Sequence, residues 1–232
     1  RRAEVEVRPP FPVTEGLYKK PTVVNNVETL AAAAGILLNG AEKFSSIGNK
    51  KSAGTKLVCF DSFFNNPGVY EIEMGTPMKK VLNDIGGGFK EPVKALQIGG
   101  PLGGVIPIAE AEKLNLDFQE FTAAGFMLGH ASIVSIPKDF PMVEYIHHLF
   151  EFTAEESCGK CFPGRLGSYR GKEMFDQLKS KTAKIPLKVL NDLLLTMKNG
   201  CLCALCGAIP TPIMNILKYF GDEMKDDMVN EN

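Results

Sequence analysis

Five of the six cysteines of this chain lie in two short segments near its C-terminal end. The first segment reads Glu-Ser-Cys-Gly-Lys-Cys-Phe-Pro-Gly-Arg and contains the Cys-x-x-Cys pair Cys158 and Cys161. The second reads Cys-Leu-Cys-Ala-Leu-Cys and contains Cys201 followed by the pair Cys203 and Cys206. Because thiolates at this spacing bind iron–sulfur clusters or tetrahedral zinc, the two pairs predict a metal centre. A disulfide and unligated buried thiols are the alternatives.

The chain between the two segments explains how they would meet. Residues 168–181 and 187–199 have helical character, and an antiparallel hairpin of two helices returns the chain to its starting end. Four sulfurs would then converge on one site. His147 and His148 lie in a helix expected from residue 139 or 141 to 155, and we do not expect either to be a ligand.

The first segment also carries a family resemblance. Its Glu-Ser-Cys-Gly-Lys-Cys-x-Pro resembles the cluster-binding signature of the flavin-bearing NADH dehydrogenase subunit of respiratory complex I. Related subunits occur in NAD-linked hydrogenases and formate dehydrogenases. In that family the signature continues Cys-Arg-x-Gly, and a further cysteine follows in Leu-Cys-x-Leu-Gly. The resemblance implies that Cys158, Cys161 and Cys203 are ligands of a [4Fe–4S] cluster.

The remaining ligand departs from the family pattern. The family's third cysteine falls on Gly164, which has no side chain, whereas Cys206 stands where the family usually has glycine. We therefore expect ligation by Cys158, Cys161, Cys203 and Cys206. Cys201 is the alternative source, since alternate residues of an extended segment point to one face. A cluster with three cysteine ligands is the other alternative.

A second stretch resembles the end of the same family's flavin domain. It reads Lys-Pro-Thr-Val-Val-Asn-Asn-Val-Glu-Thr-Leu, and the resemblance places Asn25 and Asn26 near the FMN phosphate. From residue chemistry alone, one of these asparagines caps a helix over residues 27–38. No Gly-x-Gly-x-x-Gly motif occurs in the sequence. We therefore expect the chain alone to bind neither FMN nor NADH tightly, although the complete subunit would use FMN and NAD(H).

The pattern of elements predicts an α+β fold in three parts. Residues 1–52 begin with a proline-rich arm expected to be extended and form the end of a flavin-binding domain whose remainder is absent. Residues 53–137 show two strands, a helix beginning near Thr76, and two more strands, which is a β-grasp pattern. It resembles the soluble-ligand-binding β-grasp module of the family. Residues 138–232 form the helical iron–sulfur-binding domain, ending in a helix from Pro210 and a tail over 221–232 expected to fray.

Composition excludes several other classes of protein. The 26 basic and 27 acidic residues give a formal net charge of −1, which argues against a nucleic-acid-binding protein. The longest apolar stretch, 121–137, is interrupted by polar and turn-forming residues, so no membrane span is expected. Reduced cysteines fit a cytoplasmic protein, attached to a membrane only through partner subunits. The start at Arg1, without methionine, suggests a fragment or a processed product.

The function implied by the resemblance is electron transfer. The chain would be part of an NAD(P)H dehydrogenase-type oxidoreductase subunit, inactive alone, that passes electrons between FMN and the cluster. Its partners would be other iron–sulfur subunits of a complex I, hydrogenase or formate dehydrogenase type of assembly. The alternative is a non-catalytic interaction module stabilised by four-cysteine zinc, which would be redox-silent.

Overall fold

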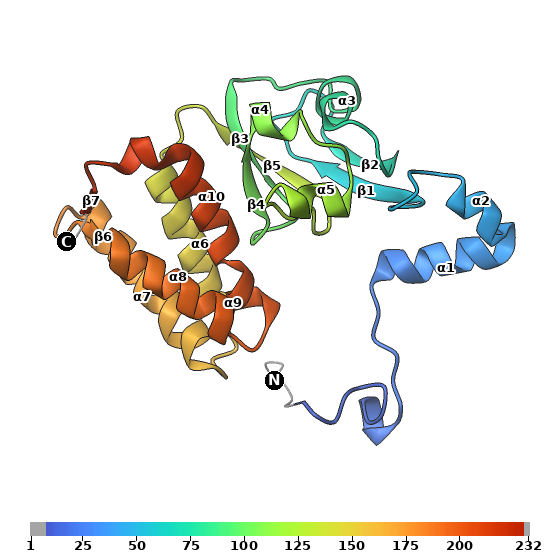
Figure 1. Ribbon diagram of the computed structural model, residues 1–232, viewed down its shortest axis with the longest axis horizontal. Helices are drawn as coiled ribbons and strands as arrows, with labels where there is room; N and C mark the ends of the chain where they lie inside the picture. The colour runs from blue at the N-terminus through green and yellow to red at the C-terminus, as the bar shows by residue number, and fades with distance from the viewer. Residues whose placement is uncertain (1–7, 230–232) are drawn as a thin grey trace.

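A mixed five-stranded sheet forms the centre of the molecule (Figure 1). The structure, a computed structural model, describes residues 8–229. The strands are β1 (Thr55–Phe60), β2 (Gly68–Glu73), β3 (Val93–Ile98), β4 (Gly104–Pro107) and β5 (Ser132–Pro137), in the order β2-β1-β5-β3-β4. The central pair β1 and β5 is parallel, and the other pairs are antiparallel. The strands expected from the sequence are confirmed, and β4 is an addition to them.

The alternation of β1 determines where Cys59, the cysteine outside the two segments, lies. Side chains of successive strand residues point to opposite faces, and Val58 and Phe60 point into the core. Cys59 lies between them and is therefore exposed on the other face.

Short helices cover one side of the sheet and enclose the first hydrophobic core. They are α3 (Met78–Lys80), which continues as a π-helical turn over Val81–Ile85, α4 (Ile108–Ala111) and α5 (Phe118–Ala123). The N-cap of α3 is Pro77, and the hydroxyl of Thr76 donates to the Glu73 carbonyl at 2.8 Å. Fully buried residues of this core include Phe64, Met78, Leu82, Leu96, Ile98, Ile106 and Phe121.

A bundle of helices packs against the sheet and encloses a second core (Figure 1). The helices are α6 (Met142–Glu156), α7 (Phe162–Lys179), α8 (Leu187–Gly200), α9 (Ala204–Ala208) and α10 (Pro210–Phe220). Ala95, Val105 and Ile136 of the sheet belong to the same core as the apolar faces of these helices. The sheet thus packs directly against the helical bundle that carries both cysteine segments.

Three details of the bundle differ from the sequence-based expectations. Helix α7 begins at Phe162 rather than at residue 168, because Cys161 is extended and Pro163 occupies the first turn, where proline is favourable. The second cysteine segment contains the beginning of the short helix α9, which was not expected from the sequence. The described part of the tail is not frayed: Met224 is buried, and β7 (Met228–Val229) pairs with β6 (Ile185–Pro186).

The N-terminal segment projects away from the sheet (Figure 1) and enters neither core. It contains a short 3-10 turn (Leu17–Lys19), α1 (Val27–Asn39) and α2 (Ala41–Ser45), none of which has a fully buried side chain. Figure 1 shows the two helices extending away from β1 and β2. Residues 1–7 of the expected extended arm lie outside the described part of the chain. Among the described residues, no helix has the length and apolar character needed to cross a bilayer.

Candidate metal centre

The first cysteine segment is a tight connection between α6 and α7. Helix α6 ends at Glu156, and Gly159 has a φ of +75°, a conformation that glycine adopts without steric cost. The chain reverses at this point and enters α7 with Cys161 as the N-cap residue. Cys158 is exposed and Cys161 is half-buried.

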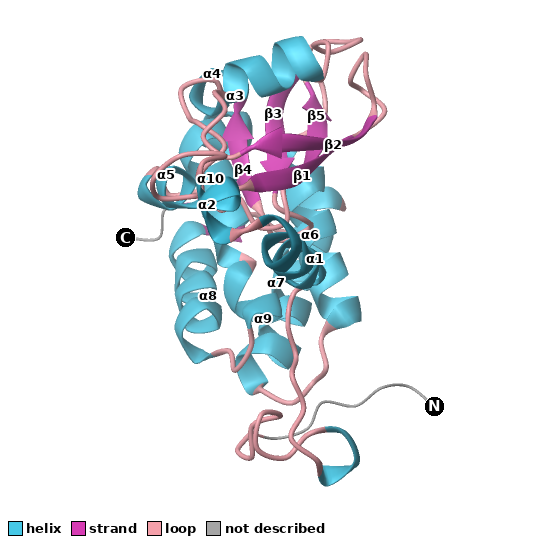
Figure 2. Cartoon of the chain, turned by 90° about the vertical axis from the view of Figure 1, so that its right-hand side faces the viewer, coloured by secondary structure: helices cyan, strands magenta, loops and turns pink. Residues whose placement is uncertain are grey.

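The second segment connects α8 to α10 through α9. Helix α8 ends at Gly200, and a β-carbon on this glycine would lie 3.0 Å from Cγ of Pro163 in the first turn of α7. The end of α8 therefore touches the beginning of α7, as expected for an antiparallel hairpin. Figure 2 shows α7, α8 and α9 meeting at one end of the bundle.

The sulfurs from the two segments converge beside Gly164. A β-carbon built on this buried glycine would lie 2.9 Å from Sγ of Cys161 and 3.0 Å from Sγ of Cys206. The two sulfurs are therefore no more than about 6 Å apart. Cys206 also interacts electrostatically with Cys158 and Cys203. The structure thus places Cys161 and Cys206 side by side and the two Cys-x-x-Cys pairs at the same end of the bundle (Figure 2).

Cys201 lies at the same end of the bundle. Its side chain is hydrogen-bonded to Cys161, and it interacts electrostatically with Cys203 and Cys206. It is half-buried, and its Cβ lies 3.7 Å from the β-carbon position of Gly207. Five thiols therefore lie at this end of the bundle, whereas the expected ligand set has four.

The surroundings of the sulfurs give them different proton affinities. The backbone N–H of Leu202 donates to Cys161 and, with the N–H of Gly164, lowers the pKa of this thiol. Burial raises the pKa of Cys206, and burial together with the neighbouring sulfurs raises that of Cys201 to about 12. A bound metal would overcome a raised pKa such as that of Cys206, because a thiol that coordinates a metal loses its proton.

Ser157 is a neighbour of the site that the sequence reasoning did not single out. Its Oγ lies 3.9 Å from Sγ of Cys206, and it also accepts a hydrogen bond from the N–H of Gly159. A small hydroxyl residue directly before a Cys-x-x-Cys pair was the available signal. The contact links the first segment to the second.

The donor chemistry of the site fits a thiolate-bound metal or cluster. All six cysteines are free of disulfides, so the disulfide alternative is not observed. Within residues 8–229, no three His, Cys, Asp or Glu side chains already form a closed ligand set around one point. The sulfurs are gathered from two loops that a metal would draw together.

Neither histidine considered in the sequence contributes to this site. Nε2 of His147 lies 2.7 Å from Oδ1 of Asp176, near the far end of α7. At a rise of about 1.5 Å per residue, Asp176 lies roughly 22 Å along α7 from Cys161. His148 is exposed on α6.

Basic side chains surround the exposed rim of the site. Lys160 and Arg165 are exposed, and the guanidinium of Arg165 lies over the Phe162 ring at 5.9 Å. Arg170 instead pairs with Glu173 on the surface of α7 at 2.6 Å. Lys160 and Arg165 therefore supply positive charge next to the cysteines.

The two asparagines expected near a flavin lie at the start of α1, in a different part of the molecule (Figure 1). Oδ1 of Asn26 accepts from the N–H of Glu28 at 2.8 Å, so Asn26 is the N-cap of α1. Oδ1 of Asn25 accepts from the N–H of Asn26. The helix cap predicted from residue chemistry is confirmed.

A cavity of about 360 Å³ lies beside this helix start. Its lining includes Asn26, Lys56 of β1 and His130 from the loop before β5. Lys56 is buried and pairs with Glu28. The basic groups of this cavity are thus partly neutralised.

Comparison with known proteins shows which iron–sulfur binding region the cysteine segments resemble. The NADH-ubiquinone oxidoreductase-F iron–sulfur binding region matches residues 144–227. These residues are therefore similar to that iron–sulfur binding region. The iron–sulfur binding region thus begins in α6 and includes both cysteine segments.

Two proteins of known type are similar to nearly the whole chain and not only to the iron–sulfur binding region. The NADP-reducing hydrogenase subunit HndC of Solidesulfovibrio fructosivorans is 37% identical over 226 residues, which are 96% of this chain and 46% of that protein. The F subunit of the NADH-quinone oxidoreductase of Escherichia coli (strain K12) is 36% identical over 230 residues, covering 97% of this chain and 51% of that protein. The chain spans about half the length of the curated relatives it matches.

Solved structures share its arrangement of elements. The crystal structure of an NAD+-reducing NiFe hydrogenase in the H2-reduced state matches 98% of this chain and 39% of that chain. The TM-score is 0.85 at 28% sequence identity. The combination of the mixed sheet and the helical bundle is therefore also present in that hydrogenase.

Proposed function

We propose that this chain is the electron-transfer portion of an NADH-linked flavin and iron–sulfur oxidoreductase subunit, passing electrons between FMN and a [4Fe–4S] cluster. The observation that carries the proposal is the convergence of Cys161 and Cys206 beside Gly164 within a matched iron–sulfur binding region. An iron–sulfur cluster supplies one-electron redox chemistry when bound. The subunit is of the NAD(P)H dehydrogenase type, and this chain is inactive without its flavin-binding remainder.

The proposed ligands are Cys158, Cys161, Cys203 and Cys206. The neighbouring residues affect the pKa, the burial and the electrostatic surroundings of these ligands. The N–H groups of Leu202 and Gly164 lower the pKa of Cys161 and so favour its thiolate form, and the buried Cys206 would exclude water from its side of a bound cluster. Lys160 and Arg165 add positive charge that favours a more negative, reduced centre.

The flavin end of the path is proposed to lie at the start of α1. Asn25 and Asn26 would contact FMN there, next to the cavity that Lys56 and His130 help to line. In this proposal residues 1–52 are the end of a flavin domain, 53–137 a β-grasp domain and 138–232 the cluster domain. The antiparallel β1–β2 hairpin, the helical segment after it and the parallel β1–β5 pairing support the β-grasp assignment.

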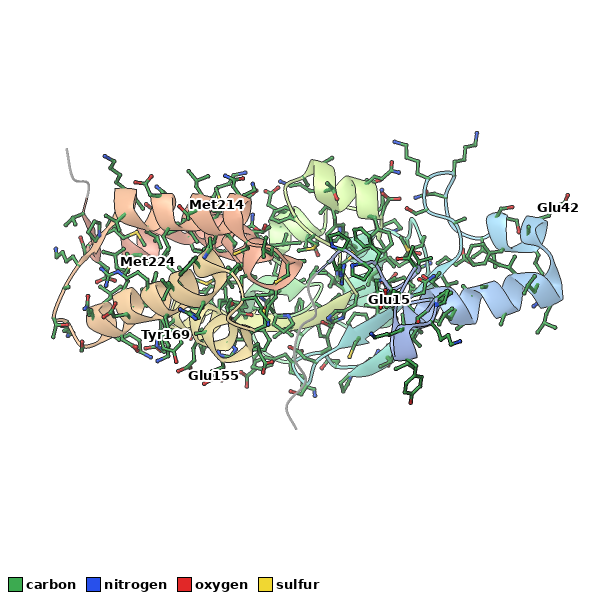
Figure 3. All side chains as sticks on the ribbon, turned by 90° about the horizontal axis from the view of Figure 1, so that it is seen from below. Glu15, Glu42, Glu155, Tyr169, Met214 and Met224 are labelled. Carbon is green, nitrogen blue, oxygen red and sulfur yellow. The ribbon has the colours of Figure 1, made fainter. Side chains whose placement is uncertain are left out.

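The proposed partners are other iron–sulfur subunits of a multi-subunit oxidoreductase in the cytoplasm. Large apolar side chains next to the cysteines support a protein partner at this end of the bundle. Phe162 is 72% exposed and Leu202 is 83% exposed, and Leu202 donates its N–H to Cys161. Tyr169, two turns along α7 from Phe162, points outward from the bundle (Figure 3). A partner on this surface would bring its own cluster close to the cysteines.

Metal analysis distinguishes this proposal from a zinc-stabilised module. We expect anaerobically purified protein to be brown and to contain iron and acid-labile sulfide. Colourless protein with one zinc per chain would refute the electron-transfer proposal and support the module, because zinc is redox-silent.

Substitution of single cysteines tests the ligand set. Cys206→Ser should lose most of its iron and sulfide, whereas Cys201→Ser is the matched control and should keep both. Unchanged iron content and EPR spectrum in Cys206→Ser would refute the assignment of Cys206. Loss of the cluster only in Cys201→Ser would assign the ligand to that residue instead.

A further inference from the structure

We infer that the hydrogen bond between Asn49 and Asp117 fixes the orientation of α1 and α2 and thereby positions the proposed flavin contacts relative to the cysteine segments. The inference rests on the proposed function only for what is positioned, because the hydrogen bond itself needs no cofactor. It assigns to Asn49 and Asp117 the role of positioning residues.

Helices α1 and α2 depend on such a contact because no hydrophobic core holds them. Neither helix buries a side chain fully, and Val27, Leu37 and Leu38 of α1 are each more than 80% exposed. Glu28 attaches the beginning of α1 to β1. A helix that is attached at one end alone can swing about that end, so a second attachment has to set its direction.

The connection between α2 and β1, residues 46–54, is folded so that the side chain of Asn49 has one orientation. The N–H of Asn49 donates to the Ser52 carbonyl at 3.1 Å, and the N–H of Gly54 donates to the Ile47 carbonyl at 2.8 Å. Oδ1 of Asn49 accepts from the N–H groups of Lys51 at 2.9 Å and Ser52 at 2.8 Å, as in an Asx turn. The connection thus uses Oδ1 and leaves Nδ2 to contact the rest of the molecule.

Asp117 receives this amide at the beginning of α5. Nδ2 of Asn49 donates to Oδ2 of Asp117 at 2.9 Å, and Asp117 is only 2% exposed. Oδ1 of Asp117 caps α5 by accepting from the N–H groups of Gln119 at 2.8 Å and Glu120 at 3.0 Å. Burial raises the pKa of Asp117, but hydrogen bonds from Asn49 and the cap outweigh it and lower that pKa to about 2. A buried, ionised carboxylate therefore holds the amide of Asn49 at neutral pH.

The backbone after β2 holds Asn49 from a second side. A β-carbon on Gly75 would lie 2.9 Å from Nδ2 and 3.1 Å from Cβ of Asn49. Gly75 has a φ of +84°, a conformation that glycine adopts without steric cost, and its N–H donates to the Leu116 carbonyl at 2.8 Å. Residue 49 thus fits between two segments of the sheet domain that are themselves hydrogen-bonded to each other.

The segment that contains α1 and α2 is therefore fixed at both of its ends. Glu28 attaches it to β1 where it begins, and Asn49 attaches it to α5 where it returns to the sheet. The proposed flavin contacts, Asn25 and Asn26, come directly before the first attachment. Holding two reacting groups at a fixed separation and orientation favours transfer between them. Loss of the second attachment should therefore let the proposed flavin end move relative to the cysteines.

Reversal of the hydrogen bond tests the inference in the full chain. Asn49→Asp keeps an oxygen for the connection but places a carboxylate against that of Asp117, so the contact should break. Combining it with Asp117→Asn exchanges donor and acceptor, because the introduced amide can still cap α5 through its oxygen and can donate to the new carboxylate. Asn191→Asp is the matched control, since it makes the same chemical change at an exposed position of α8.

The measurement is the distance between spin labels at residues 42 in α2 and 188 in α8, both of which are exposed. Attachment through an azide-bearing amino acid leaves the six cysteines unaltered. The distance distribution from double electron–electron resonance should become about twice as wide in Asn49→Asp, as expected when a segment is released locally. The double variant and the Asn191→Asp control should keep the narrow distribution of the unaltered protein.

Two results would overturn the inference. One is an unchanged distribution in Asn49→Asp, and the other is a double variant that stays as wide as Asn49→Asp, since the contact between the two side chains would then not set the orientation. If circular dichroism shows that Asn49→Asp does not fold, Asn49→Ser replaces it, because serine can accept within the connection without facing Asp117 with a charge. Iron analysis of the same samples keeps the two proposals apart: iron-free unaltered protein refutes the proposed function and leaves the measured orientation standing.

Discussion

Nε2 of His147 in α6 lies 2.7 Å from Oδ1 of Asp176 in α7, and this contact joins the two helices that deliver the first cysteine segment. His147 is buried, whereas the carboxylate of Asp176 is about half exposed. Burial by itself raises the pKa of Asp176, but hydrogen bonds from His147 and Lys172 outweigh it and lower that pKa. The negative charge of Asp176 thus stabilises the folded state.

Asp176→Asn should lower the free energy of unfolding by about 1 kcal/mol at neutral pH, a modest value because solvent screens the carboxylate. The folded pKa of Asp176 is depressed, so its contribution is present above the ordinary pKa near 3.8 and is lost as pH falls through the folded value. Urea unfolding at pH 7 and pH 3 should show the difference between the two proteins shrinking at low pH. Glu173→Gln, on the same helix and exposed, is the control, and an equal effect there would contradict the prediction.

Gly171 allows α6 and α7 to approach closely. A β-carbon at this position would collide with the ring of Phe150. Gly171→Ala should therefore destabilise the protein by about 1–3 kcal/mol, as overpacked cores do. Gly35→Ala in α1 is the control: nothing lies within 4 Å of the added carbon, and helix propensity predicts no loss of stability. Equal thermal unfolding of the two variants would be inconsistent with close packing at Gly171.

Glu28 is the main attachment of α1 to the sheet. Its carboxylate pairs with the buried Lys56 and accepts from the N–H of Leu57 at 3.0 Å, while α1 buries no side chain fully. Glu28→Gln should raise amide hydrogen exchange in α1 by roughly tenfold, which corresponds to about 1.4 kcal/mol of local stability. Glu42→Gln in the exposed α2 (Figure 3) should leave exchange in α1 unchanged. Equal exchange in both variants would show that α1 is held by other contacts.

Tyr145 connects the helical bundle to the sheet through buried polar groups. Its hydroxyl donates to Oε1 of Gln97 at 2.8 Å, and Nε2 of Gln97 donates to the Pro101 carbonyl at 2.7 Å. Burial raises the pKa of Tyr145, so the hydroxyl stays protonated. Tyr145→Phe leaves a buried acceptor unpaired and should cost about 1–3 kcal/mol in chemical denaturation. Tyr169→Phe, at an exposed position, should cost almost nothing, and a comparable loss there would contradict this account.

Local patterns in the sequence were sufficient for most of the elements. The Asn26 cap, the strand that contains Val58 and the helix from Pro210 all follow from short-range rules. The two Cys-x-x-Cys pairs also indicated correctly which ends of the bundle meet.

Tertiary contacts determined what the sequence left open. Cys59 is an apolar-type residue that strand parity turns outward. The tail as far as Val229 is ordered because β7 pairs with β6, a pairing between segments far apart in the chain. The closeness of Gly164 and Cys206 depends on how α7 and α9 pack. Motif spacing could therefore indicate Cys206 as a candidate ligand, but it could not predict that Cys206 lies beside Gly164. Short-range sequence rules contain no information about contacts between segments that are far apart in the chain.

The distance along the chain between the two cysteine segments has a consequence for the unfolded state. With the proposed ligands, a cluster ties Cys158 to Cys206 and closes a loop of about 50 residues. A cross-link over a loop of this length removes unfolded conformations worth about 4 kcal/mol in the chain-entropy treatment of disulfides. Loss of the cluster would therefore lower the unfolding temperature even if every helix of the folded bundle stayed in place. The reason is that the conformational entropy gained belongs to the unfolded chain.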